Sequence, residues 1–148
     1  MQFHVCDRRS VEQGIVVREA YVLISIRDPD KPSVRYRRPA GLRDVLALDF
    51  HDAELALGIK LPKGVQLMRA EDAVKIWEFV QRHREHIGAI VCHCEQGMSR
   101  SPAVAWALAE ALEGDVDAIL ASSQPNKYVY ELLRDTIARL ASKETRRG

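Results

Sequence analysis

Short apolar runs alternate along this chain with longer stretches in which apolar residues recur every three or four positions. The runs with the length and β-branched content of buried strands are 2–5, 21–26, 45–50 and 89–92. The stretches with helical periodicity are 69–86, 101–113 and 127–142, with shorter helical pieces from Ser10 and over 116–121. Strands that alternate with helices predict an α/β fold, a single domain with a mainly parallel central sheet of four to five strands flanked by helices.

The ends of two helices carry recognisable signals. Gly114 suits the C′ position after helix 101–113, and Asn126 is a good N-cap for the last helix. We place the domain over residues 1–142 and expect a polar C-terminal tail over 143–148.

Composition and charge narrow the possible functions. The chain has 148 residues, of which 47% are hydrophobic and 29% charged, enough for one packed core. A net charge of +1 gives no bulk attraction to nucleic acid or to a membrane, so neither is an expected partner. Three cysteines and a start without secretory features predict a cytoplasmic protein, which we expect to be a monomer.

Candidate chemistry lies in segment 93–101, His-Cys-Glu-Gln-Gly-Met-Ser-Arg-Ser, between strand 89–92 and the helix that follows. The N-terminus of a helix offers unpaired backbone N–H groups, which bind anions and favour the thiolate form of Cys94. The planar fork of Arg100 matches two phosphate oxygens at once, as the point charge of a lysine cannot. The segment therefore predicts a phosphate site beside a nucleophilic cysteine.

The pattern His-Cys-x-x-Gly-x-x-Arg-Ser resembles the signature loop of the cysteine-dependent protein tyrosine phosphatases, in their dual-specificity-like branch and its small bacterial members. The resemblance covers nearly the whole chain and implies the protein tyrosine phosphatase-like fold. It also implies that phosphomonoesters, foremost phosphotyrosine in proteins or peptides, are hydrolysed through a cysteinyl-phosphate intermediate, with no cofactor and no metal.

The resemblance assigns a role to each residue of the loop. Cys94 would attack phosphorus, and Arg100 would hold the equatorial oxygens. His93 would orient the strand end and support the thiolate, while the Ser101 hydroxyl would help the sulfur to leave. The backbone N–H groups that complete the phosphate cradle would come from Glu95, Gln96, Gly97, Met98, Ser99 and Arg100, with Gly97 allowing the tight turn.

The family also uses an aspartate upstream of the cysteine to protonate the leaving oxygen. Asp52 is the first candidate, because it lies just past strand 45–50, at the end of the sheet where active-site loops converge, and Phe50-His51-Asp52 resembles the acid-bearing segment. Asp49 is the second candidate and Glu54 the third. Asp72 is weaker, since its place in the first turn of a helix already explains a carboxylate.

Other interpretations fit the sequence less well. A zinc site at Cys92, His93 and Cys94 is disfavoured, because adjacent strand positions face opposite sides. Rhodaneses, which transfer sulfur, typically have fewer residues between cysteine and arginine. A phosphatase of inositol or lipid phosphates and a non-catalytic phosphate-binding relative stay as alternatives. The acidic Glu95, with no base between Cys94 and Arg100, favours a phosphoprotein substrate.

Two features bear on regulation and recognition. Cys92 could resolve an oxidised Cys94, but side chains two apart in a strand are poorly placed for a disulfide, so we expect Cys92 to be buried in the sheet. The arginine-rich segment 35–38 is expected on the active-site side, where it would recruit acidic phosphopeptides and Tyr36 would stack on a substrate ring. A solvated surface loop is the alternative for this segment.

Overall fold

The computed structural model describes residues 1–54 and 60–147 of the chain. The elements in chain order are β1 (Gln2–Asp7), α1 (Arg8–Gln13), β2 (Tyr21–Arg27), β3 (Leu42–Asp49), α2 (Ala70–His83), the 3-10 helix η1 (Arg84–His86), β4 (Ala89–Cys94), α3 (Arg100–Ala111), α4 (Val116–Ala121) and α5 (Lys127–Arg147). The strands form one parallel sheet in the order β1-β4-β2-β3. The predicted α/β class with a four-stranded parallel sheet is therefore confirmed.

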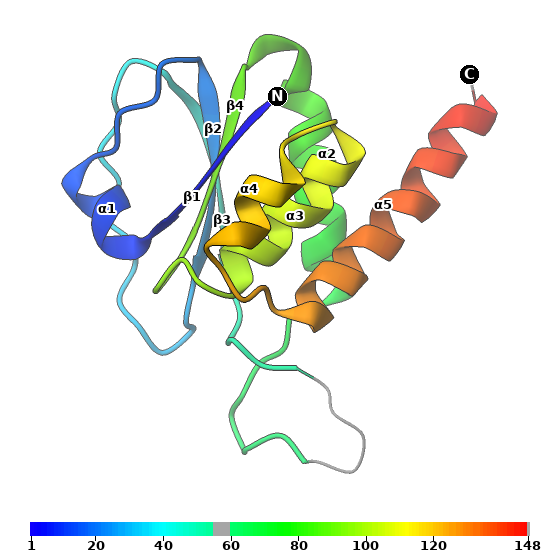
Figure 1. Cartoon of the computed structure of the whole chain (residues 1–148). Helices are drawn as coiled ribbons and strands as arrows, with labels where there is room; N and C mark the ends of the chain where they lie inside the picture. Colours follow the sequence, from blue (N-terminus) through cyan, green and yellow to red (C-terminus); the bar gives the residue numbers. More distant parts are fainter. Residues whose placement is uncertain (55–59, 148) are drawn as a thin grey trace.

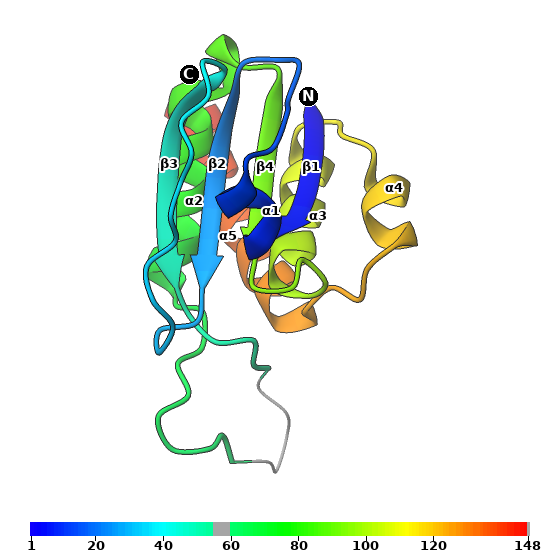
Figure 2. The same cartoon turned by 90° about the vertical axis from the view of Figure 1, so that its left-hand side faces the viewer.

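The two faces of the sheet are covered differently (Figures 1 and 2). Helices α2, α3 and α5 lie over one face, where they enclose the main core around Ile24, Ile90 and Leu108. The other face is covered by α1 and by segment 28–41, from which Val34 packs into a smaller cluster with Leu23. The sheet is thus covered on both sides, as the continuous buried strands β2 and β4 at its centre require.

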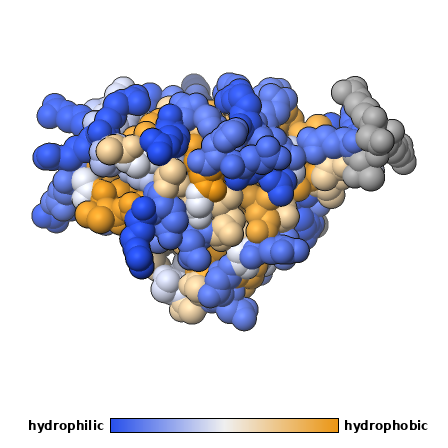
Figure 3. Space-filling model, turned by 90° about the horizontal axis from the view of Figure 1, so that it is seen from above, coloured by the Kyte–Doolittle hydropathy of each residue, from blue (hydrophilic) through white to orange (hydrophobic). Residues whose placement is uncertain are grey.

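All strands run in one direction, so their carboxyl ends lie together at one end of the sheet, the lower end in Figure 1. Seen from the opposite end, hydrophilic and apolar residues are interspersed, with hydrophilic ones around most of the outline (Figure 3). None of the described helices combines the length and the apolar character that a membrane span needs.

The end of α3 differs from the prediction. Glu113, not Gly114, adopts the left-handed conformation, with φ of 57°, and the amide of Gly114 donates to the carbonyl of Ala109 at 2.8 Å. Gly114 is therefore the C″ residue of a Schellman motif. A side chain is excluded there for another reason, because a Cβ would lie 2.6 Å from the ring of Phe3.

Other boundaries also differ from the prediction, since β1 extends to Asp7 and β3 begins at Leu42. Strand β4 continues past Cys92 and ends at Cys94, and α5 continues past Ser142 to Arg147. The N-cap of α5 is confirmed, since Oδ1 of Asn126 accepts the amide of Val129 at 3.0 Å. A domain boundary at 142 stays a prediction, and position 148 lies outside the described residues.

Candidate active site

Cys94 is the last residue of β4 and is buried, with 2% of its surface exposed. Its Sγ atom lies 3.1 Å from Oγ of Ser101 in the first turn of α3 and accepts the amide of Gly97 at 3.2 Å. A thiolate at Cys94 would accept both hydrogen bonds. The loop and the helix that follows it thus supply polar partners to the sulfur from two directions.

Several carbonyl groups of the loop after Cys94 accept hydrogen bonds from backbone amides outside the loop. Glu95 O accepts from Arg8 N at 3.3 Å, Met98 O from Gln124 N at 3.0 Å, and Ser99 O from Asn126 N at 3.0 Å. The C=O and N–H of one planar peptide group point in opposite directions. The amides that follow these carbonyls therefore point to the inner side of the loop and form a nest for an anion beside Cys94.

Gly97 allows this turn for two reasons. Its φ is +71°, a conformation that costs little only for glycine. A Cβ at this position would lie 2.7 Å from the backbone carbon of Cys6 at the end of β1. The loop therefore packs directly on the neighbouring strand.

Arg100 is 4% exposed and is fixed by two acceptors. Its Nη1 donates to the carbonyl of Phe50 at 2.6 Å and lies 2.7 Å from Oδ1 of Asp28. Its Nε is buried and has no hydrogen-bond partner among the described residues. An unpaired guanidinium N–H is costly to bury, so this edge of Arg100 is suited to an anionic ligand.

Cys94 and Arg100 line the same cavity, of about 450 Å³. Asp52 also lines it, and its Oδ1 accepts hydrogen bonds from Ser99 Oγ at 2.8 Å and from Asn126 Nδ2 at 2.9 Å. The structure therefore brings the first acid candidate to the same cavity as the cysteine and the arginine. Sequence reasoning interpreted Asn126 as a helix cap and did not foresee its contact with Asp52.

The other acid candidates lie elsewhere. Asp49 forms an ion pair with Arg27 at 3.0 Å and lines a separate pocket beside Ser25. Glu54 accepts the amide of Lys127 at 2.8 Å, at the start of α5. Asp72 is buried in the first turn of α2, where it accepts the amide of Arg69 at 2.9 Å.

His93 connects the sheet to the loop through a buried chain of hydrogen bonds. Its Nδ1 lies 3.1 Å from the carbonyl oxygen of Cys94 and its Nε2 lies 2.6 Å from Oγ of Ser25, which accepts from the hydroxyl of Tyr36 at 2.8 Å. Burial lowers the pKa of His93, so the ring is neutral. A neutral ring that donates from Nδ1 can accept from Ser25 at Nε2. These bonds reach the backbone of Cys94, whereas the sequence predicted support of its sulfur.

Glu95 points away from the anion nest. Its Oε1 lies 3.1 Å from Nη1 of Arg8, whose Nη2 binds the carbonyls of Pro32 and Ser33 at 2.6 and 2.9 Å. Arg8 thus ties the loop to α1 and to the segment after β2. Neither Arg8 nor Asp28 was identified from the sequence, although Asp28 follows directly after a buried strand, which is a signal for the carboxyl end of a parallel sheet.

The expected place of the arginine-rich segment was wrong. Tyr36 points into the sheet, where its hydroxyl binds Ser25, so it is not available to stack on a substrate ring. The side chain of Arg37 binds the carbonyl of Glu12 in α1 at 3.1 Å. Neither Tyr36 nor any of Arg35, Arg37 and Arg38 is among the described residues that line the Cys94 cavity.

Cys92 is fully buried, as expected, and burial raises the pKa of its thiol well above the usual range. Burial also raises the pKa of Cys6, on the neighbouring strand, to about 11. In the described part of the chain, no three His, Cys, Asp or Glu side chains are grouped as metal ligands would be.

Comparison with solved structures finds proteins of the same fold at low sequence identity. Human DUSP28 superposes with a TM-score of 0.58 at 14% identity, over 95% of this chain and 94% of that one. The human tyrosine phosphatase-like serine/threonine/tyrosine-interacting protein gives 0.53 at 20% identity, over 81% and 78%. PTPMT1 in complex with PI(5)P gives 0.51 at 13% identity, over 84% and 81%.

No protein-family model matches the sequence, and the comparison with curated proteins finds no match. The likeness is therefore one of fold, and it extends over most of this chain. It agrees with the protein tyrosine phosphatase-like fold that the loop sequence implied.

Proposed function

We propose that this protein is a cysteine-dependent phosphatase of the dual-specificity-like kind, which hydrolyses phosphomonoesters and foremost phosphotyrosine in proteins. The observation that carries the proposal is that Cys94 and Arg100 line one cavity, while the buried Nε of Arg100 has no hydrogen-bond partner among the described residues. A phosphate group would satisfy this N–H and the inward amides of the loop while its phosphorus lies next to the sulfur.

The first step forms the S–P bond between Cys94 and the phosphoryl group and breaks the P–O bond to the leaving group. The leaving oxygen takes a proton from Asp52. In the second step water, deprotonated by Asp52, attacks phosphorus and the sulfur leaves. Ser101 donates to the departing sulfur from 3.1 Å, and inorganic phosphate is released.

Ser99 and Asn126 act as positioning residues for the acid. Both donate to Oδ1 of Asp52, and Oδ2 has no hydrogen-bond partner in the described part of the chain. Because Oδ1 is occupied as an acceptor, a proton on the carboxyl group belongs on Oδ2. The two donors therefore select which oxygen delivers the proton.

The charges around the cavity favour a phosphoprotein over a polyphosphorylated inositide. Asp28, Asp52 and Glu95 line the cavity, and Arg100 is the only lysine or arginine among its described lining residues. Additional phosphate groups on a substrate would find no second lysine or arginine among these residues, so their charge would be unmatched. One structural neighbour, PTPMT1, was solved in complex with PI(5)P. A phosphorylated lipid is therefore the alternative substrate to test beside phosphopeptides.

The experiment compares Cys94→Ser and Arg100→Lys with the wild type in the hydrolysis of an aryl phosphate in the presence of a chelator. We expect Cys94→Ser to lose turnover by at least about a thousandfold while it still binds inorganic phosphate in calorimetry. Arg100→Lys should be nearly as damaging, because the bidentate contact is lost although the charge survives. Cys6→Ser is the control for a thiol outside the cavity.

Near-normal turnover in Cys94→Ser would rule out the mechanism, and strong inhibition of the wild type by the chelator would point to a metallophosphatase. A panel of phosphotyrosine, phosphothreonine and inositol phosphate substrates would identify the substrate class. Preference for inositol phosphates would support the alternative.

A further inference from the structure

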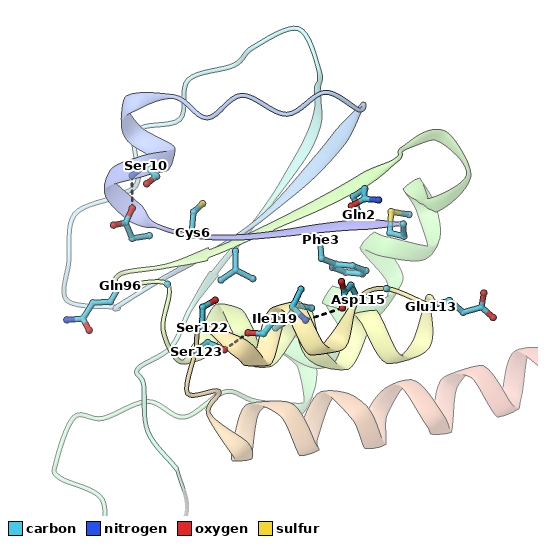
Figure 4. Close-up of a pocket in the computed structure, with 16 residues that line it drawn as sticks. Gln2, Phe3, Cys6, Ser10, Gln96, Glu113, Asp115, Ile119, Ser122 and Ser123 are labelled. Atoms are coloured by element: carbon cyan, nitrogen blue, oxygen red, sulfur yellow. Dashed lines mark hydrogen bonds between the residues drawn. The ribbon is translucent and has the colours of Figure 1, made fainter.

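A second groove, the β1-edge groove, runs between β1 and α4 and has a volume of about 710 Å³ (Figure 4). Phe3 and Ile119 point into it from the two sides. One end of the groove is formed by Gln96 and Gly97, which belong to the loop after Cys94.

No described strand pairs with the outer edge of β1. The strand lies at the end of the sheet, and on its inner side the amides of Gln2 and Arg8 bind the carbonyls of Gly88 and Glu95. Backbone groups of successive residues in a strand point to alternate edges. Those of Phe3 therefore point to the outer edge, and so do those of the next odd-numbered residue, Val5.

The charged side chains that line the groove are negative, while Met1 brings the α-amino group to it. Asp7, Glu113 and Asp115 line it, and no lysine, arginine or histidine is among its described lining residues. The hydrogen bond from Ser10 lowers the pKa of Asp7, which keeps its carboxylate charged at neutral pH. A positively charged occupant would be complementary to these side chains.

The groove adjoins the Cys94 cavity. Gln96 is exposed and lines both of them, so it forms the boundary between the two. A polypeptide whose phosphorylated side chain lies against Cys94 can therefore continue over Gln96 onto the β1 edge.

We propose that the β1-edge groove binds an extended, positively charged segment that flanks the phosphorylated residue of a protein substrate, as an added β-strand. Main-chain hydrogen bonds to Phe3 and Val5 would give affinity, and the carboxylates would select lysine or arginine. A second copy of the chain fits less well, because pairing of two β1 edges would bring their carboxylates together. This inference rests on the proposed function of Cys94 and names its substrate class.

The test uses phosphotyrosine peptides that differ only in flanking lysines or glutamates, placed before or after the phosphotyrosine. We expect kcat/KM of the lysine peptide to exceed that of the glutamate peptide by about three- to tenfold at low salt, mainly through KM. Turnover of a small aryl phosphate reports on the proposed function separately, since this substrate does not reach the groove.

The variant Glu113→Gln/Asp115→Asn removes two of the three groove carboxylates and leaves Asp7, so it should clearly reduce the preference for the lysine peptide without changing turnover of the aryl phosphate. Asparagine at 115 retains the cap that Asp115 provides to Ala118 at 3.0 Å. The matched control is Glu85→Gln/Glu131→Gln, which removes two exposed carboxylates outside the groove and should keep the preference.

Strand pairing is tested with lysine peptides N-methylated at alternate residues, bound to Cys94→Ser and followed by fluorescence anisotropy. Methylation of one set of alternate residues should weaken binding about tenfold or more, and methylation of the other set should not. The reason is that only one set of peptide amides faces β1. The inference would be overturned if methylation of either set of alternate residues had the same effect on binding, or if the lysine and glutamate peptides had equal kinetics. It would also be overturned if the wild type formed a dimer that the Glu113→Gln/Asp115→Asn variant strengthened. Each of these outcomes would count even with normal turnover of the aryl phosphate.

Discussion

Nη1 of Arg100 lies 2.7 Å from Oδ1 of Asp28, which follows the end of β2. The same nitrogen donates to the carbonyl of Phe50, which follows the end of β3. The arginine thus links the loop after β4 to the ends of β2 and β3. Both contacts are made by Nη1, and the buried Nε has no hydrogen-bond partner among the described residues.

Substitution Asp28→Asn should impair catalysis by loosening Arg100. We expect kcat/KM for an aryl phosphate to fall about tenfold, because small displacements of a positioning group are costly in the transition state. Asp30→Asn is the matched control, since Asp30 is an exposed carboxylate of the same segment that pairs with His51. Steady-state kinetics of both variants would measure this difference in kcat/KM. An equal loss of kcat/KM in the two variants would contradict a positioning role of Asp28.

Substitution Ser99→Ala should affect substrates according to their leaving group. Loss of the 2.8 Å bond to Asp52 misplaces the proton donor, which matters most when the leaving oxygen is strongly basic. We expect a loss of about tenfold with phenyl phosphate and a much smaller one with p-nitrophenyl phosphate. Asn126→Ser should behave alike, because serine can still cap α5 but cannot reproduce both donors of the amide.

The pH dependence of the rate tests Asp52 directly. If Cys94 is a thiolate and Asp52 carries the proton in the productive complex, the rate should follow a bell with an optimum below neutral pH. Asp52→Asn should flatten its basic limb. The same result from Asp49→Asn, with Asp52→Asn retaining the bell, would move the role to Asp49.

Gly97→Ala should lower the free energy of unfolding by more than the backbone strain of a positive φ would by itself. The new Cβ would meet the backbone of Cys6 at 2.7 Å in addition to the positive φ. Gly64→Ala is the matched control, because Gly64 also has a positive φ, +87°, but a Cβ there meets nothing within 4 Å. Urea denaturation should give a loss of about 1 kcal/mol for Gly64→Ala and of about 3 kcal/mol or more for Gly97→Ala.

The buried His93 should make stability depend on pH. Burial lowers its pKa in the folded state, whereas in the unfolded chain it titrates near about 6.5. Between these two pKa values the unfolded state binds an extra proton, so the free energy of unfolding falls as the pH is lowered through about 6.5. Urea denaturation between about pH 7.5 and 5.5 should show a smaller decrease for His93→Asn than for the wild type. The exposed His86→Asn should keep the wild-type decrease.

The loop of the candidate site could be predicted because its residues are contiguous. The spacing of Cys94 and Arg100, the glycine between them and the helix that follows are all local features. The strands could be predicted equally well, since both faces of the sheet are covered and their apolar runs are continuous.

Contacts between distant segments could not be predicted in the same way. Asp28 and Arg100 are far apart in the sequence and meet only because β2 and β4 are neighbours in the sheet. Segment 35–38 was misjudged because its charges suggested a contact with the substrate. Arg35, Arg37 and Arg38 are exposed but lie outside the Cys94 cavity, whereas Val34 and Tyr36 pack against the face of the sheet that α1 partly covers. Packing decided the direction of these side chains, and local composition did not indicate it.

The first strand of the chain pairs with the last, Asp7 opposite Cys94. Pairing over such a distance in the sequence closes a long loop, which makes folding slow and leaves β1 without a partner until β4 has been synthesised. Gly97 then packs against Cys6 in the same region. We therefore expect that during translation the reactive loop acquires its shape only when the sheet is completed, so that no shorter nascent chain carries an assembled anion nest.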